Sequence, residues 1–386
     1  MIPRRELPRL LRKALRQPGY ALAAFGKRMR AYMGYRFGGP PAWPENITLF
    51  LTYRCNMRCR MCGQWGESGT SNSYDGATIS GALSVDELKS VIDDVTGFRP
   101  NITLFGGEPL VYRGWDEVTS YATRRGLRVN MVSNGLLMGS SAEAMIRSGL
   151  AEVILSLDGP EEVHDRIRGV PGAFRRISEG ARTLARLKEE SGSRTPLLNV
   201  SCTIGEENHG MLPEVAAIAA DMDASGITFH HQIFAGEEQY VASEKIFMDR
   251  LGLPETDWKG FVRQSPPGID PSKVIAARAG MPPAPEGFRV SFYPNLTDEE
   301  VRAYYTGFRF KPASYRDRCL SPWMVAYVFP DGSVRPCQAI NYDTGNVRDI
   351  KFRDIWRGER YAEFRELVKR ERCFSVCSRC TEFYRY

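Results

Sequence analysis

Three of the nine cysteines in this 386-residue sequence fall within eight residues, in the stretch "CNMRCRMC". Their spacing is Cys55-x3-Cys59-x2-Cys62. Closed metal sites built from cysteine, such as structural zinc sites, take four protein ligands. Three thiolates therefore indicate either a zinc site that a residue elsewhere completes, or a metal centre that keeps one position open.

A second group of five cysteines lies near the C-terminus, and Cys202 stands alone between the groups. The late cysteines are Cys319, Cys337, Cys373, Cys377 and Cys380. The sequence shows no secretory signal and no apolar run long enough to span a membrane, so we expect a cytoplasmic protein. Thiols stay reduced in that compartment, which favours metal ligands over disulfides. The clustering predicts two metal sites.

Strand and helix patterns alternate from residue 46 onward, which is typical of a parallel sheet covered by helices. We expect six strands, over 46–53, 101–105, 128–133, 152–158, 197–203 and 226–231. Polar and glycine-rich residues follow each strand, as in the "GGEP" of residues 106–109. The carboxyl ends of barrel strands form the active-site face. Six β/α units predict a partial, open (β/α)6 TIM-like barrel with a wide mouth.

The three-cysteine loop after a first strand, followed by "GGEP" after the second, resembles the radical S-adenosylmethionine (SAM) superfamily over about residues 46–235. This resemblance disfavours the zinc interpretation. It implies a [4Fe-4S] cluster in which three irons bind Cys55, Cys59 and Cys62, and SAM binds the fourth iron through its amino and carboxylate groups. It also implies reductive cleavage of SAM to a 5'-deoxyadenosyl radical that abstracts a hydrogen atom from the substrate.

The resemblance further implies SAM contacts around this cluster, although "GGEP" could also be a plain strand-to-helix turn. Glu108 is expected to pair with the SAM ammonium, and Arg168 is a candidate for the SAM carboxylate, with a solvated helix-surface arginine as an equal alternative. Met61 stands where this family often has an aromatic residue, so adenine would contact a thioether. The expected cofactor-binding residues are Met61, Gly106, Gly107, Glu108, Pro109, Ser133, Asn134, Ser156, Asp158 and Arg168.

The late cysteines resemble the SPASM and twitch auxiliary domains of radical SAM enzymes, from about residue 311 to 386. Five cysteines fit one auxiliary [4Fe-4S] cluster, with a structural zinc site as the alternative. A fully ligated cluster would transfer electrons, whereas a free thiol at Cys373 could return a hydrogen atom, as in an epimerase. The resemblance implies Cys373 as a spare or alternative ligand and, as the main ligands, Cys319, Cys337, Cys377 and Cys380.

Strand parity and the spare late thiol supply weak candidates for catalysis. Ser201 and Thr203 alternate with Cys202, so if the polar face lines the barrel, Cys202 packs against helices. By the same rule His230 and Gln232 point toward the substrate, yet a lone histidine is as often a packing residue. The weak candidates are His230, His231, Gln232 and Cys373.

The N-terminal segment concentrates the positive charge. Residues 1–37 carry ten Lys or Arg and one acid, a net charge of +9, while the whole chain carries +6. Leucines and arginines alternate at helical spacing within residues 5–16. A second apolar series follows, at Leu22, Phe25, Met29 and Met33. Such a basic amphipathic segment either packs on the main domain with a solvated face or contacts an anionic membrane surface.

These patterns predict an α/β protein with a basic helical arm (1–45), a radical SAM core (46–235), a connector that shapes the substrate entrance (236–310) and an auxiliary cluster domain (311–386). The expected reaction oxidises a small or lipid-linked metabolite or forms a bond in it. Crosslinking or epimerisation of a ribosomally made peptide is the alternative, and a non-catalytic iron-sulfur scaffold is another.

Several partners follow from this prediction. An external electron donor such as flavodoxin or ferredoxin is required to reduce the cluster. Contact with the inner membrane face would run through the arm. Nucleic acid is not expected, because no basic surface with interleaved aromatic residues is legible beyond the arm.

Overall fold

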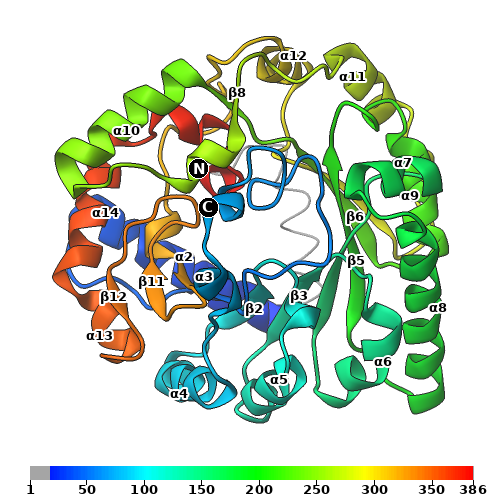
Figure 1. The fold of residues 1–386 in the computed structure, drawn as a ribbon, viewed down its shortest axis with the longest axis horizontal. Helices are drawn as coiled ribbons and strands as arrows, with labels where there is room; N and C mark the ends of the chain where they lie inside the picture. The colour runs from blue at the N-terminus through cyan, green and yellow to red at the C-terminus, as the bar shows by residue number, and fades with distance from the viewer. Residues whose placement is uncertain (1–17, 386) are drawn as a thin grey trace.

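A ten-stranded sheet forms the centre of the α/β fold (Figure 1). The computed structural model describes the backbone of residues 18–385 and the side chains of residues 24–385. The strands of the sheet are β1 (Asn46–Phe50), β2 (Asn101–Phe105), β3 (Val129–Ser133), β4 (Glu152–Ser156), β5 (Leu197–Ile204), β6 (Gly226–His231), β9 (Arg289–Tyr293), β10 (Val325–Val328), β11 (Ser333–Arg335) and β12 (Gly345–Asn346).

The strand order is β12-β11-β10-β1-β2-β3-β4-β5-β6-β9, and every pair from β10 to β9 is parallel. The six expected strands are thus confirmed, and so is the predicted class of α/β fold with an open, barrel-like sheet. Four further strands extend it, the parallel strands β9 and β10 and, beyond β10, the antiparallel strands β11 and β12. β9 comes from the predicted connector and pairs with β6, and β10 comes from the predicted auxiliary domain and pairs with β1.

Helices cover the outer face of the sheet, as Figure 1 shows for the arc from α4 to α9. α4 begins at a capping box, in which Ser84 accepts from the Glu87 amide and Glu87 accepts from the Ser84 amide. The helices are α2 (Pro18–Phe37), α3 (Gly76–Ser80), α4 (Val85–Val95), α5 (Trp115–Arg124), α6 (Met138–Arg147), α7 (Glu161–Arg168), α8 (Ala173–Ser191), α9 (Leu212–Asp221), α10 (Glu237–Leu251), α11 (Pro271–Ala279), α12 (Asp298–Thr306), α13 (Phe352–Arg357) and α14 (Glu359–Glu371). A separate pair of short strands comprises β7 (Ala235–Gly236) and β8 (Val262–Arg263).

β5 illustrates how the sequence pattern places residues on the two faces of the sheet. Its residues alternate between half-buried and buried along the whole strand. Cys202 is fully buried in the core beneath the helices, as predicted, while Ser201 and Thr203 lie on the other face. Burying a leucine- or valine-sized side chain stabilises the fold by about 1.5–3 kcal/mol, so the alternate apolar side chains of β5 are held against the helices. The polar side chains between them face the inside of the barrel.

The C-terminal region is attached to the barrel by more than the β1–β10 pairing. On α13, Arg353 forms an ion pair of 2.5 Å with Asp94 of α4. Arg348 pairs with Glu87 at 2.6 Å, and the Trp356 indole donates to the carbonyl of Ala42 at 2.9 Å. The segments on the two sides of the predicted boundary at residue 311 therefore share one continuous sheet.

α2 lies at the edge of the sheet where strands begin. The Lys27 ammonium donates to the carbonyl of Arg99, two residues before β2, at 2.9 Å. Arg28 pairs with Glu45, which directly precedes β1, at 3.1 Å. The leucine-rich part of the predicted arm lies outside the described side chains. None of the helices described here is long and apolar enough to cross a membrane.

Candidate functional site: two cysteine centres

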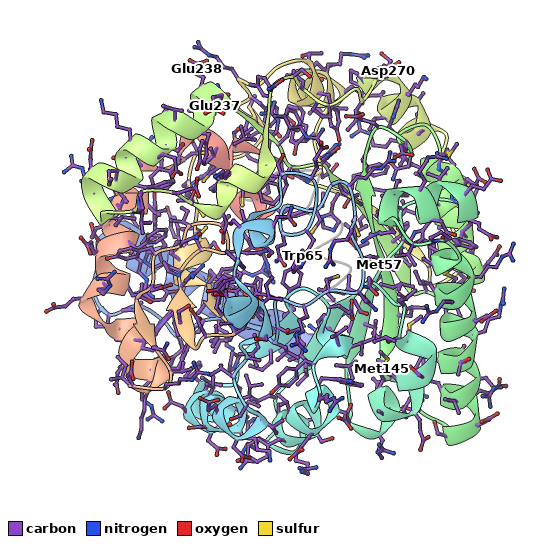
Figure 2. All side chains as sticks on the ribbon, viewed as in Figure 1. Met57, Trp65, Met145, Glu237, Glu238 and Asp270 are labelled. Atoms are coloured by element: carbon purple, nitrogen blue, oxygen red, sulfur yellow. The ribbon has the colours of Figure 1, made fainter. Side chains whose placement is uncertain are left out.

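The early cysteines lie together in the loop that follows β1. Cys55, Cys59 and Cys62 contact one apolar patch that includes Met57 and Leu136. Cys59 is buried, and the other two thiols are half-buried. Figure 2 shows Met57 and Trp65 of this loop in the middle of the ring formed by the sheet and the outer helices. One short loop therefore brings three thiols to the carboxyl edge of the sheet.

Each of these three thiols has a donor directed at its sulfur. The Asn134 amide lies 3.9 Å from Cys55 Sγ, and the Trp65 backbone N–H lies 3.3 Å from Cys62 Sγ. The Arg168 guanidinium lies 3.6 Å from Cys59 Sγ. Burial raises the pKa of Cys55 to about 11, so binding to iron must offset the cost of the thiolate. Donors to sulfur stabilise thiolate charge and tune the potential of a bound cluster.

"GGEP" holds the base of this loop. The Gly107 amide donates to the Thr52 carbonyl at 2.7 Å, and the Glu108 amide donates to the Arg54 carbonyl at 2.9 Å. A Cβ on Gly107 would lie 2.2 Å from the Arg54 carbonyl oxygen, and Gly106 has a φ of +135°. Both positions therefore exclude a side chain, because the chain after β2 passes directly against the chain that leads into Cys55. The segment does more than turn the chain.

Glu108 binds two of the other predicted SAM contacts, Ser133 and Asn134. It is 1% exposed and accepts from the Ser133 hydroxyl and the Asn134 backbone N–H, both at 2.8 Å, and from the Leu110 backbone N–H at 3.1 Å. Burial raises the pKa of Glu108, and these donors oppose that shift. Asn134 then reaches Cys55. Glu108 thus ties the ends of β2 and β3 to the cysteine loop, and its contact with the SAM ammonium stays a prediction.

Asp158 and Arg168 form the second support of the loop. Arg168 is 9% exposed and pairs with the fully buried Asp158 at 2.5 Å, so the alternative of a solvated surface arginine is wrong. Burial alone would lower the pKa of Arg168, but Asp158 and Cys59 together raise it above its usual value. Asp158 also accepts from the Thr203 amide at 2.8 Å. The cation is therefore held at the cysteine loop, where it can meet a carboxylate.

The remaining predicted SAM contacts lie at the same edge of the sheet. Ser156 is half-buried at the end of β4, and Met61 is half-buried beside the three thiols. Pro109 is buried in the turn that Glu108 caps. Their contacts with the adenosine part stay predictions.

The three candidates on and after β6 separate in the structure. His230 is half-buried on the inner face, 5.6 Å from the Tyr293 ring, and burial lowers its pKa to about 4. His231 is 1% exposed and bonded to the Tyr305 hydroxyl at 2.7 Å, which makes it a packing residue. Gln232 is 5% exposed, and its carbonyl accepts from the Tyr304 hydroxyl. His230 is thus a neutral side chain on the barrel face at neutral pH.

The late cysteines meet in the C-terminal region. Cys319, Cys337, Cys377 and Cys380 all pack against one core cluster that contains Phe364. Cys373 packs against the other large core cluster instead, which also contacts Cys319 and Cys380. Burial raises the pKa of Cys337 to about 11 and that of Cys373 to about 12. Four thiols on one core match the predicted ligand set. Burial, and after it the charge of Cys373, raises the pKa of Cys377, which indicates that Cys373 lies near this set.

No three His, Cys, Asp or Glu side chains among the described residues converge on a point where one metal ion would sit. In a four-iron cluster each thiolate binds its own iron, so such ligands need not converge on a single ion. The donors on the early thiols, the glycine contacts and the four late thiols fit [4Fe-4S] clusters.

The sequence patterns gave no signal for a polar junction between the two centres. Asp257, in the predicted connector, accepts from the Asn341 amide at 3.1 Å and lies 3.8 Å from the Arg335 guanidinium. Tyr74 donates to the same carboxylate at 3.5 Å, and the ring of Tyr53 lies 5.1 Å from that of Tyr74. Tyr53 precedes Cys55 by two residues, and Arg335 precedes Cys337 by two. Remote segments build this junction, so local sequence could not predict it.

Family models match two parts of the chain. Residues 49–202 match the radical SAM superfamily, and residues 319–381 match SPASM, an iron-sulfur cluster-binding domain. The two matches contain both cysteine groups.

Two curated relatives and one solved structure illustrate the similarity. The AdoMet-dependent heme synthase of Oleidesulfovibrio alaskensis is 26% identical over 337 residues, which are 86% of this chain and 79% of that protein. The PqqA peptide cyclase of Rhodopseudomonas palustris is 24% identical over 324 residues, 81% of this chain and 74% of that protein. The crystal structure of Streptococcus suis SuiB bound to its precursor peptide SuiA superposes with a TM-score of 0.58 at 13% identity, covering 93% of this chain and 76% of SuiB.

The SuiB likeness concerns the fold alone, whereas the matched domains concern the cofactors. [4Fe-4S] clusters and SAM are the cofactors that this pair of domains implies, and the geometry of both cysteine centres fits them. The chain belongs to the radical SAM superfamily and carries a C-terminal SPASM-type iron-sulfur cluster-binding domain.

Proposed function

We propose that this enzyme oxidises a small metabolite, with SAM bound at the early cysteines and an electron-accepting cluster at the late ones. The observation that carries the proposal is the unequal donor sets, with three thiols at the carboxyl edge of the barrel and four on the C-terminal core. When bound, the early cluster and SAM supply the radical that removes a hydrogen atom. A fully ligated late cluster has no place for substrate, which supports a role in electron transfer.

The long similarity to heme synthases supports a small substrate. It spans most of this chain, across both cysteine centres, and tetrapyrroles are therefore the first class to test. The inner face of the sheet offers uncharged polar groups to such a ligand, for example Thr103, Ser201 and His230. His230, neutral at physiological pH, can donate or accept a hydrogen bond there.

A peptide substrate is the second candidate. The PqqA cyclase similarity and the fold of SuiB, which was solved with a peptide, both favour it. In this case the connector would guide the peptide, because it touches the cysteine loop: Gly260 approaches Gly63 so closely that a Cβ on Gly260 would lie 2.2 Å from the Gly63 carbonyl.

A lipid-linked substrate has the least support. Phe25, Met29 and Met33 of α2 are exposed, together with Phe37, and they form an apolar line at i, i+4 spacing that could meet a membrane. α2 lies, however, at the amino edge of the sheet, and the cysteine loop follows the carboxyl end of β1. A membrane bound by α2 would therefore lie at the opposite edge of the sheet from the cysteine loop.

The proposal is tested with anaerobically reconstituted enzyme, SAM and a reductant. A panel of metallated tetrapyrroles and synthetic peptides is incubated, and the products are followed by mass spectrometry together with 5'-deoxyadenosine. We expect a substrate-dependent rise in 5'-deoxyadenosine and a two-electron-oxidised product from the small molecules. A product from peptides alone would replace the proposal with the maturase alternative. If 5'-deoxyadenosine did not exceed the level of a Cys59→Ala control, the scaffold alternative would stand instead.

A further inference from the structure

The outer side of the cysteine loop bears a positively charged hollow that the SAM site does not use. It has a volume of about 550 Å³ and is lined by Arg58, Arg60, Trp65, Gly66 and Glu67. The residues that reach the thiols from the barrel, Asn134, Leu136 and Arg168, do not line it. The hollow therefore opens on a different side of the loop from the SAM contacts.

The charge of this loop is one-sided. Between residues 54 and 67 it carries three arginines, Arg54, Arg58 and Arg60, and one acid, Glu67. All three arginines are exposed, and Arg58 and Arg60 flank the buried Cys59. Cations thus face solvent from the same few residues whose thiols face inward.

Neighbouring acids only partly neutralise these cations. Arg60 pairs with Glu207 at 3.5 Å, but Arg166 of α7 forms an ion pair with the same carboxylate. One acid is therefore shared between two arginines. The Arg60 side chain remains 70% exposed, so an incoming anionic surface can reach it.

Trp65 connects the hollow to the thiols. Its ring lies 4.1 Å from the Arg58 guanidinium on the side of the hollow, and its backbone N–H donates to Cys62 Sγ at 3.3 Å. The indole N–H donates to the Tyr53 carbonyl at 2.8 Å, which fixes the ring. One residue therefore lines the surface hollow and also contacts a ligand of the early centre.

We propose that this hollow, rimmed by Arg58 and Arg60, is the docking site for a small acidic one-electron donor protein of the flavodoxin or ferredoxin kind. Electron tunnelling weakens steeply with distance, so a donor must approach the cluster closely, and the loop that holds the thiols offers the shortest approach. The donor loses one electron and the early cluster gains one, and no bond forms or breaks at this surface. Opposite charges steer such brief encounters and orient the partners.

Two substitutions of matched exposure test the proposal. Arg60→Glu reverses a charge at the hollow, and the Arg60 side chain bonds only the Glu207 carboxylate. Arg147→Glu reverses a charge on α6, where Arg147 is 67% exposed and pairs with Glu143 at 3.4 Å. Both variants lose one weak surface ion pair, so they differ mainly in position. Iron content and the thermal transition of both variants confirm that each is folded and loaded.

Binding is measured with reconstituted holoenzyme by fluorescence anisotropy of oxidised flavodoxin and by titration of ferredoxin, at low and at moderate salt. We expect Arg60→Glu to raise the Kd by about tenfold and Arg147→Glu to leave it within about twofold. Raising the salt should weaken wild-type binding and narrow the difference between the variants. Equal Kd values for the two variants, or no binding of either donor to the wild type, would overturn the proposal.

A second measurement separates docking from chemistry. 5'-Deoxyadenosine formation from SAM without substrate is driven either by reduced flavodoxin or by dithionite, a small reductant that needs no docking surface. Arg60→Glu should slow only the flavodoxin-driven rate. An equal loss with dithionite would show that Arg60 acts on the cluster itself and would refute the docking role. Because no substrate is present, this outcome is independent of the proposed metabolite oxidation.

Discussion

The two cysteine centres are built in opposite ways. The early centre takes its thiols from one loop. Two of the side chains that donate hydrogen bonds to its sulfur atoms, Asn134 and Arg168, come from other parts of the barrel. The late centre collects thiols from residue 319 to residue 380, while backbone amides a few residues further on donate to Cys319, Cys337 and Cys380. In the early centre the thiols are close in sequence and two of the donors to them are remote. In the late centre the thiols are far apart in sequence and the donors to them are close.

This difference separates two tasks. Asn134 and Arg168, whose side chains donate to early thiols, also bind Glu108 and Asp158, Asn134 through its backbone N–H and Arg168 through its guanidinium. They therefore couple the thiols to the groups expected to hold SAM. The backbone donors beside the late thiols come from the same short segments as the thiols themselves. Outer groups orient and tune metal ligands, so we expect the first arrangement at a centre that binds SAM and the second at a centre that transfers electrons.

The largest expected effect comes from removing an early ligand. Cys59→Ala should reduce 5'-deoxyadenosine formation to background and lower the iron content from about eight to about four atoms per chain, because each cluster holds four irons. Iron and sulfide analysis of anaerobically purified protein measures this. An unchanged iron content would mean that the early loop holds no cluster and would break the comparison.

The next effect distinguishes the late cysteines from one another. Cys377→Ala should remove the auxiliary cluster and leave about four irons, whereas Cys373→Ala should retain about eight. The reason is that Cys377 packs on the core shared by the four predicted ligands, and Cys373 packs on a different one. Loss of iron in the Cys373 variant would exchange the assignments.

A smaller effect is expected at the support of the early centre. In Glu108→Gln either orientation of the amide directs an N–H at the backbone N–H of Asn134 or of Leu110. This should lower the free energy of unfolding by about 1–3 kcal/mol and weaken SAM binding, with the auxiliary cluster retained. Urea denaturation and SAM titration measure it, and Glu143→Gln on the exposed face of α6 is the control. If the auxiliary cluster were lost as well, the two centres would not be supported independently.

The smallest effect concerns α2, which contributes no predicted ligand to either centre. Sedimentation with vesicles containing anionic lipid should fall by at least a few-fold when residues 1–37 are removed, since each basic residue near such a surface contributes about 1 kcal/mol and the segment carries ten of them. SAM cleavage by the truncated protein should stay unchanged. Equal sedimentation of the full and truncated chains would refute the membrane contact.

The clustering of the early cysteines in one loop and the six strands of the core could be predicted because their signals are local. Spacing alone brings Cys55, Cys59 and Cys62 into one loop, and alternation along β5 places Cys202 under the helices. The burial of Arg168 could not be predicted, because it depends on Asp158 from another element. Nor could the pairing of β10 with β1, since nothing in either strand specifies a partner so far along the chain.

One pentapeptide separates what the sequence determines from what depends on the tertiary structure. β1 and β2 have the same sequence, "NITLF", and pair with each other in register from Asn46 with Asn101 to Phe50 with Phe105. The sequence determines that both are strands with Ile and Leu beneath the helices. Only β1 is buried on both faces, because the C-terminal region covers it: Phe329 stacks on Phe50 at 4.5 Å. β2 keeps its inner face half-exposed toward the barrel, where we propose that the substrate binds.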